Sequence, residues 1–256
     1  MKAIKFIVLA GFLLSLTGCN AAGKPSQKGI TLSYEESAQV ELVSPAGIRV
    51  LIDVYDPDIL SSPPTAADVL LTTHSHSDHF NLDFIKSFPG QQIQMRKGEL
   101  KLGDVSVRSI VASHNLIDQL DPEKGSDYIF IVDTGGLRFV HFGDLGQESL
   151  TQEQLDAIGK VDVAVMQFSN SYSSMSLQNK KGFNLMDQVK PRLIIPTHQD
   201  ADTAKYATQK WPSFYWDQKS IQLSPASLTG ETRFLIMGDL AKGFGKLFNL
   251  PVWENQ

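Results

Sequence analysis

Three histidines and one aspartate lie within six positions of the run Thr73-His74-Ser75-His76-Ser77-Asp78-His79-Phe80. Ordinary hydrogen bonds in a protein core cannot satisfy three imidazoles and a carboxylate that stand so close together. Two neighbouring divalent cations would use every one of them. We therefore expect a fold that delivers this segment to a metal centre, and the alternative is a histidine-rich polar turn.

The expected secondary structure divides this cluster between two positions. Ala66–Thr72 is predicted to form a buried strand, so that His74 and His76, two residues apart, point to the same side. A helix is predicted from Asn81 to Phe88, and the turn into it carries Asp78-His79 toward a second position. One loop would thus supply ligands to two ions.

Further candidate ligands follow strands that we expect downstream. They are His114 after Val105–Ala112, Asp144 after Leu137–Phe142, and His198 after Arg192–Pro196. Glycines flank the aspartate in Gly143-Asp144-Leu145-Gly146 and let the backbone approach closely. Strand-end loops gathered on one rim of a sheet are where ligand sites are usually built.

The order of these motifs resembles that of the metallo-β-lactamase-fold hydrolases: H-x-H-x-D-H, a single histidine, G-D-x-G, then P-x-H after an apolar strand. The chain is most similar to single-domain proteins of the ascorbate-phosphate lactonase and N-acylphosphatidylethanolamine phospholipase branch, which share the T-H-x-H-x-D-H core and the pattern of Phe139–Asp144. The resemblance begins at Ile30, includes an opening hairpin over Ala38–Asp53, and implies a four-layer αββα sandwich. Apolar strands that alternate with helical stretches such as Thr151–Ile158 independently favour an α/β fold.

The resemblance also implies which residues hold each ion. His74, His76 and His114 would bind the first metal, Asp78, His79 and His198 would bind the second, and Asp144 would bridge them. Two cations would lower the pKa of a shared water toward neutrality and so provide a hydroxide nucleophile. Asp78 would orient that nucleophile and accept its proton. Zinc is the expected ion, and manganese or iron also suits these ligands.

Other polar residues carry smaller expectations. Asp53, after the strand Val50–Ile52, resembles a carboxylate that holds a ligand imidazole by its free nitrogen, and a plain turn aspartate is the alternative. His141 lies inside a strand and is predicted to be a packed residue and not a ligand. Asp200 is predicted to cap a helix over Ala201–Lys210.

Two segments are candidates for the walls of a substrate pocket. The polar, serine-rich loop Gln167–Asn179 offers Asn170 and Tyr172 for substrate recognition, with an ordinary surface loop as the alternative. We also expect the aromatic stretch Trp211–Trp216 to shape the pocket. The side chains of neither segment identify the substrate.

The amino terminus resembles a bacterial lipoprotein signal. A basic lead, Met1–Lys5, precedes an apolar core, Phe6–Leu16, which is too short to span a bilayer and runs directly into Thr17-Gly18-Cys19. Cys19 is the only cysteine of the chain, and its lipidation would tether the protein to a membrane. A secretory peptide with an incidental cysteine is the alternative.

These features predict a lipoprotein signal peptide over residues 1–18, a lipidated tether over 19–29 and one hydrolase domain over 30–256. The expected location is the bacterial cell envelope. Asn20 after the cysteine, in place of an aspartate, indicates the outer membrane in a two-membrane organism.

Charge and ligand types narrow the function. The net charge of -5 and the lack of a Lys/Arg cluster argue against a nucleic-acid partner, and the sequence implies no protein partner. One group of metallo-β-lactamases uses a second-site cysteine, which is absent after Cys19, and the other lacks a bridging aspartate, which Asp144 would supply. We therefore expect hydrolysis of an ester, lactone or phosphodiester in a small molecule or lipid headgroup, and not of β-lactams. A thioester hydrolase of the same fold and a non-catalytic metal-binding envelope lipoprotein are the alternatives.

Overall fold

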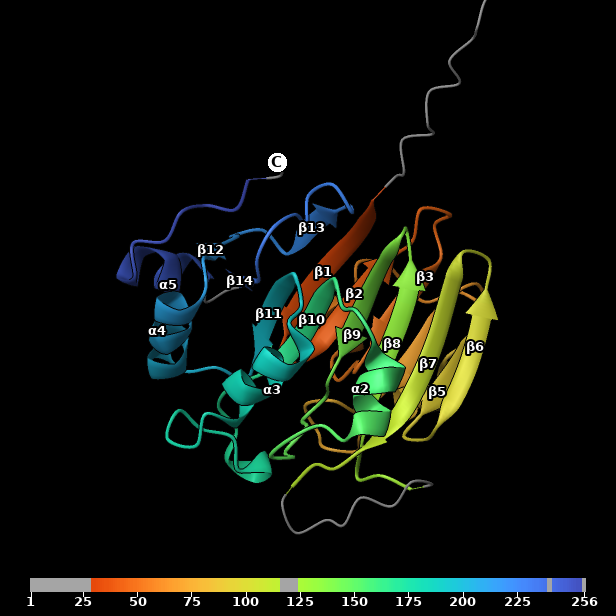
Figure 1. Cartoon of the computed structure of the whole chain (residues 1–256). Coiled ribbons are helices and arrows are strands. Elements are labelled where there is room, and N and C mark those ends of the chain that lie inside the picture. Colours follow the sequence, from red (N-terminus) through yellow and green to blue (C-terminus); the bar gives the residue numbers. More distant parts are fainter. Residues whose placement is uncertain (1–28, 116–123, 239–240, 255–256) are drawn as a thin grey trace, which may run out of the picture.

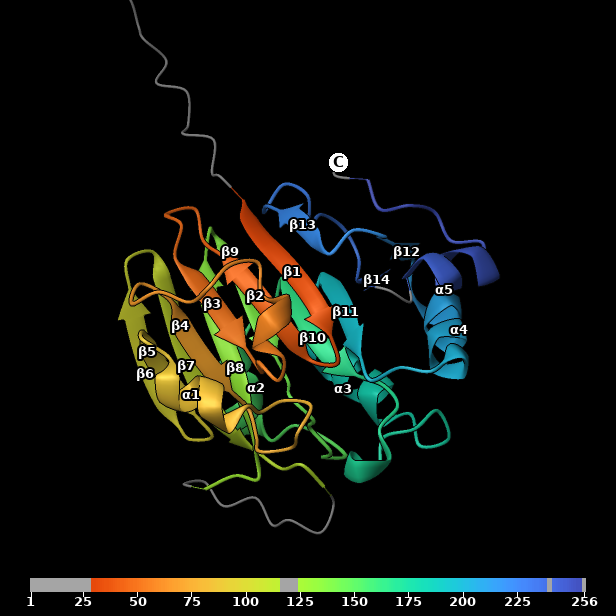
Figure 2. The same cartoon turned by 180° about the vertical axis from the view of Figure 1, so that it is seen from behind.

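The computed structural model describes residues 29–115, 124–238 and 241–254. Two β-sheets pack face to face, and helices cover both outer faces, as Figures 1 and 2 show from opposite sides. This arrangement confirms the predicted αββα sandwich. The predicted signal peptide, Cys19 and the tether up to residue 28 lie outside the described residues.

The first sheet has six strands in the order β13-β1-β2-β3-β4-β5. They are β1 (Ile30–Glu36), β2 (Gln39–Val43), β3 (Arg49–Ile52), β4 (Val69–Thr72), β5 (Gln91–Gln94) and β13 (Ser220–Leu223). The antiparallel pairing of β2 with β3 contains the predicted opening hairpin, while β3, β4 and β5 run parallel. The parallel strands β3 and β4 therefore end at the same edge of the sheet, where Asp53 and the histidine cluster begin.

The second sheet has eight strands in the order β12-β14-β11-β10-β9-β8-β7-β6. They are β6 (Gly98–Leu102), β7 (Val105–Ala112), β8 (Asp127–Thr134), β9 (Leu137–His141), β10 (Val163–Gln167), β11 (Leu193–Thr197), β12 (Ser213–Tyr215) and β14 (Arg233–Ile236). Strands β9, β10 and β11 are parallel neighbours. Their carboxyl ends therefore lie together, and the loops after β9 and β11 carry Asp144 and His198.

Three of the described α-helices begin at a residue whose side chain caps them. They are α1 (Leu82–Ser87), α2 (Gln152–Ile158), α3 (Lys181–Val189), α4 (Ala201–Lys210) and α5 (Ala241–Leu247), with 3-10 turns η1 (Pro57–Ile59) and η2 (Ser171–Ser173). Asn81 caps α1, Thr151 forms a capping box on α2, and Asp200 caps α4 as predicted. Helix α1 covers the first sheet (Figure 2), and α2 and α3 cover the second (Figure 1).

Alternation along the strands separates the apolar layers. In β4, Val69 and Leu71 face the core between the sheets, whereas Leu70 faces outward and packs with Phe84 and Phe88 at α1. A third cluster lies between the second sheet and α2 to α5. These layers pack the sheets and helices together, so that the loops at the rim of the sheets extend from a buried core.

The strand predicted over Ala66–Thr72 is shorter than expected. It begins at Val69, because Asp68 accepts a hydrogen bond from the Thr65 amide at 2.7 Å and closes a turn. The same carboxylate pairs with buried Arg49 at 2.7 Å. Among the described residues, no helix is long and apolar enough to cross a membrane.

Candidate metal centre

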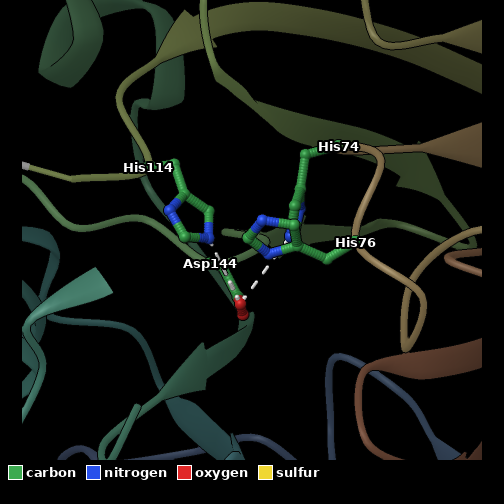
Figure 3. Close-up of side chains that lie close together, drawn as sticks. All are labelled: His74, His76, His114 and Asp144. Carbon is green, nitrogen blue, oxygen red and sulfur yellow. Dashed lines mark ion pairs between the residues drawn. The ribbon is translucent and has the colours of Figure 1, made fainter. Parts of the chain in front are cut away.

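All seven predicted ligands converge, although they come from loops after four different strands. His74, His76 and His114 lie with Asp144 in one group, and their ligand atoms lie within 4.8 Å of one another. Figure 3 shows His114 facing His74 and His76, with the carboxylate of Asp144 below the gap between them. Asp144 Oδ2 lies 3.7 Å from His74 Nε2 and 3.6 Å from His114 Nε2.

The second group contains Asp78, His79 and His198, also within 4.8 Å of one another. The other carboxylate oxygen of Asp144 faces this group: Oδ1 lies 3.3 Å from His79 Nε2 and 3.4 Å from His198 Nε2. Asp78 Oδ2 lies 3.7 Å from His198 Nε2. Each oxygen of Asp144 therefore faces a different set of imidazoles.

The donor atoms of the site fit divalent cations. His74 Nε2, His114 Nε2 and Asp144 Oδ1 are buried and have no hydrogen-bond partner among the described residues. Unpaired buried polar atoms are costly, and imidazole nitrogens with carboxylate oxygens are the donors that such metals prefer. A metal-binding His/Asp cluster accounts for the convergence of these atoms.

Asp53 lies at the position predicted for an orienting carboxylate. Its Oδ2 lies 2.8 Å from His79 Nδ1, and its two oxygens accept from the amide and hydroxyl of Thr73 at 2.7 and 2.8 Å. Burial alone would raise the pKa of Asp53, but the charge and hydrogen bond of His79 lower it below the ordinary value. Burial opposes protonation of His79, yet Asp53 and Asp144 raise its pKa well above the ordinary value.

Asp127 is a site residue that sequence reasoning missed. It is completely buried at the start of β8, and its Oδ1 lies 3.4 Å from His74 Nδ1. Burial raises the pKa of this carboxyl. Gly143 packs against it in a left-handed conformation (φ 55°), and a Cβ there would collide with the Asp127 carboxylate. In the sequence, Asp127 could have been recognised as an acidic residue that stands directly before the apolar run Tyr128–Val132.

The loop Gln167–Asn179 reaches the centre. Asn170 Nδ2 donates to Asp144 Oδ2 at 2.6 Å, and the ring of Tyr172, 79% exposed, lies 6.0 Å from that of His76. A cleft of about 760 Å³ opens beside these residues. Its lining consists of His76, Ser77, Asp78, Asp144, Ser169, Asn170, Ser171, Tyr172 and His198.

Trp211–Trp216 does not line this cleft, so that expectation is wrong. Trp211 instead stacks on Phe183 and Phe234 in the core under α3. His141 is buried, lies 2.9 Å from the Ala38 carbonyl through Nε2, and accepts from the Gly143 amide at 3.1 Å. It is a packed strand residue, as predicted.

Comparison with known proteins agrees with this architecture. The family model of the beta-lactamase superfamily domain matches residues 31–198. UPF0173 proteins of Pyrococcus furiosus and Pyrococcus abyssi are 24% and 21% identical to it over an alignment 178 positions long, and the match covers 61% of this chain and 78% of each of theirs.

Solved structures share the fold at low sequence identity. A metallo-β-lactamase superfamily protein of Thermotoga maritima superposes with a TM-score of 0.59 at 19% identity, over 81% of this chain and 98% of that one. Igni18, a metallo hydrolase of Ignicoccus hospitalis, gives 0.52 at 18% identity, over 71% and 91%.

Proposed function

Since the chain belongs to the β-lactamase superfamily, we propose that it is a membrane-tethered, dinuclear hydrolase of an ester, lactone or phosphodiester. Metal-dependent hydrolysis is the general activity that this fold supports. Binding of two ions is supported by the orientation of the Asp144 carboxylate. Its Oδ2 faces His74 and His114, whereas its Oδ1 faces His79 and His198. A carboxylate that meets two sets of ligands with different oxygens is suited to bridge two ions.

His74, His76, His114 and Asp144 would hold one ion, and Asp78, His79, His198 and Asp144 would hold the other. Zinc is the proposed ion, because imidazole and carboxylate donors suit it, and manganese or iron fits the same donors. When bound, such ions would supply Lewis-acid chemistry: they would lower the pKa of a water and polarise the substrate oxygen. No serine or cysteine nucleophile is then required.

Asp78 is proposed to position the nucleophile and accept its proton. Its side chain is 43% exposed, whereas that of His79 is completely buried. Asp78 also lines the cleft, so its side chain can be reached by a substrate or water. A general base must reach the reacting atoms, and the exposure of Asp78 permits this.

The cleft supports a small, polar substrate. Beyond the proposed ligands, its lining consists of neutral hydrogen-bonding side chains: Ser77, Ser169, Asn170, Ser171 and Tyr172. The exposed ring of Tyr172 offers a flat surface for an apolar part of the molecule. A small metabolite or a lipid headgroup fits such a lining, and a polyanion such as nucleic acid finds no basic stripe in it.

We also propose that the protein is lipidated at Cys19 and works in the bacterial cell envelope. Support comes from the resemblance of the first residues to a lipoprotein signal. Labelling of the expressed protein with a fatty-acid probe tests this, because Cys19→Ser should abolish incorporation if Cys19 is the acceptor.

The hydrolase is tested on protein that begins at Asn20, by metal content per chain and turnover of bis(p-nitrophenyl) phosphate, lactones and thioesters. We expect two metals per chain and turnover that a chelator removes. Less than one tightly bound metal would contradict the ligand assignment. Two metals without turnover on the whole panel would favour a non-catalytic metal-binding lipoprotein.

A further inference from the structure

We propose that Lys181 is a positioning residue for the metal centre: its buried ammonium fixes the loop of Asp144 against the loop of Asn170. This inference rests on the proposed function, because it assigns Lys181 to the geometry of the same site. Lys181 is the first residue of α3 and is completely buried. It touches none of the proposed ligands directly, so it would act through the backbone that carries them.

Burial of an ammonium group at this position is energetically unfavourable. Lys181 Nζ donates to the carbonyl oxygens of Gly146 at 2.8 Å and Ser173 at 3.0 Å. Among the described residues, no carboxylate oxygen lies within ion-pair distance of it. The charge of the exposed residue Glu148 acts on it only from beyond that distance. A buried cation without an ion-pair partner costs free energy, and a Met side chain would fill similar space without that cost. Packing alone therefore does not account for a lysine here.

Its first acceptor lies where ligand-bearing loops meet. Gly146 follows Asp144 by two residues, and its amide donates to the Ser113 carbonyl at 2.9 Å, next to His114. A Cβ on Gly146 would collide with the His114 carbonyl, so only glycine fits this contact. A bond to the Gly146 carbonyl therefore restrains the segments of both His114 and Asp144.

Its second acceptor ends the turn that carries Asn170. Ser173 closes η2, whose cap Asn170 donates to Asp144 Oδ2 at 2.6 Å. Gln167, completely buried at the end of β10, makes a parallel connection: its Nε2 donates to the Leu145 carbonyl at 3.0 Å and to Ser173 Oγ at 2.8 Å.

Two buried side chains, Lys181 and Gln167, therefore join the same pair of loops. The join holds the Asn170 amide on one oxygen of Asp144 and so fixes the rotation of that carboxylate. This rotation decides which oxygen faces which set of imidazoles, and partners outside the ligand set commonly tune metal affinity in this way.

The test is Lys181→Met in the chain from Asn20, with Lys180→Met as the matched control. Lys180 is the exposed neighbour, and its ammonium lies over the Tyr206 ring instead of in the site. Zinc affinity is measured by competition with a chromophoric chelator, and thermal unfolding of the metal-free protein is measured beside it. We expect Lys181→Met to lower the affinity for at least one ion about 10- to 100-fold without lowering the unfolding temperature, and Lys180→Met to change neither.

A double-mutant cycle separates positioning from general damage. If Lys181 acts through the Asn170 loop, the loss of affinity in Lys181→Met with Asn170→Ala should be smaller than the product of the two single losses. Losses that multiply, or wild-type affinity in Lys181→Met, would overturn the proposal. If Lys181→Met does not fold, Gln167→Leu replaces it in the same cycle, because it cuts the parallel connection.

The readout is metal affinity, so the outcome does not depend on a known substrate. Failure of the proposed hydrolase would appear as wild-type protein that binds its metals but turns over nothing. Failure of the positioning role would appear as a Lys181 variant that binds zinc like the wild type.

Discussion

Asp53→Asn tests whether the carboxylate behind His79 tunes the metal centre. Asp53 is completely buried, and its oxygens accept three hydrogen bonds: from the Thr73 amide, the Thr73 hydroxyl and His79 Nδ1. Asparagine has one acceptor oxygen in place of two, so either Thr73 or His79 must then face a donor. Asp53 has a φ of 52°, a left-handed conformation that asparagine tolerates, so the substitution adds no backbone strain.

The expected magnitude follows from the lost charged hydrogen bond. Such a bond contributes about 1.5 to 3 kcal/mol. Loss of a partner outside the ligand set typically lowers metal affinity about 10- to 100-fold, which corresponds to roughly 1.4 to 2.7 kcal/mol. The two ranges agree, so we expect Asp53→Asn to weaken the ion held by His79 by about this factor.

Competition with a chromophoric zinc chelator measures the effect, and Asp58→Asn is the control, since Asp58 is exposed in η1 away from the ligands. The ion held by His74, His76 and His114 should be removed at nearly the same chelator concentration as in the wild type. Wild-type affinity for both ions in Asp53→Asn would refute the reasoning, because the buried bond to His79 would then contribute nothing to the site.

The remaining predictions concern the bridge, the base, the metals and the buried lysine. Asp144→Ala should lose one ion and nearly all turnover, measured by elemental analysis and kinetics; a fully active two-metal variant would exclude the bridge. Asp78→Asn should keep its metal but lower kcat about 10²- to 10⁴-fold, and unchanged kcat would exclude its role as base. Chelation should destabilise the protein by about 2.7 kcal/mol for each site that had been held at a hundred times its Kd, measured by denaturant unfolding. Burial lowers the pKa of the Lys181 ammonium in the folded protein below its ordinary 10.5. Between that folded pKa and 10.5, the unfolded chain holds this proton and the folded protein does not. Metal-free wild type should therefore gain stability relative to Lys181→Met as pH rises toward 10.5, and a constant difference between pH 7.5 and 10 would contradict this.

Local signals in the sequence were enough for most elements of the fold. The alternation of Val105–Ala112 gives β7 with the predicted bounds, and Asn81 and Thr151 cap the helices where expected. The strand over Ala66–Thr72 begins late because the Asp68 carboxylate closes a turn with Thr65, and Arg49 binds the same carboxylate. No local pattern reveals the contact with Arg49, which lies 19 positions away.

The candidate ligands were visible because metal chemistry limits residue types and because strand ends place them at one rim. Their partners were not visible in the same way. Asp127, Asn170 and Lys181 are single polar residues in unremarkable surroundings, and only the fold brings them beside His74, Asp144 and Gly146. From sequence alone, a lysine at the start of a helix is expected to be exposed, and only the structure shows that Lys181 is buried.

The sequence by itself therefore determined the kinds of ligands, their order and the sheet ends on which they stand, since these depend on short-range patterns. The resemblance also implied how the ligands divide into two groups, but only the tertiary structure decided how closely the two groups approach and which oxygen of Asp144 faces each of them. His79 and His198 are 119 residues apart in the chain, yet their Nε2 atoms lie 3.2 Å apart. That approach depends on the packing of two sheets and on the rotation of Asp144, and both are set by contacts between distant segments.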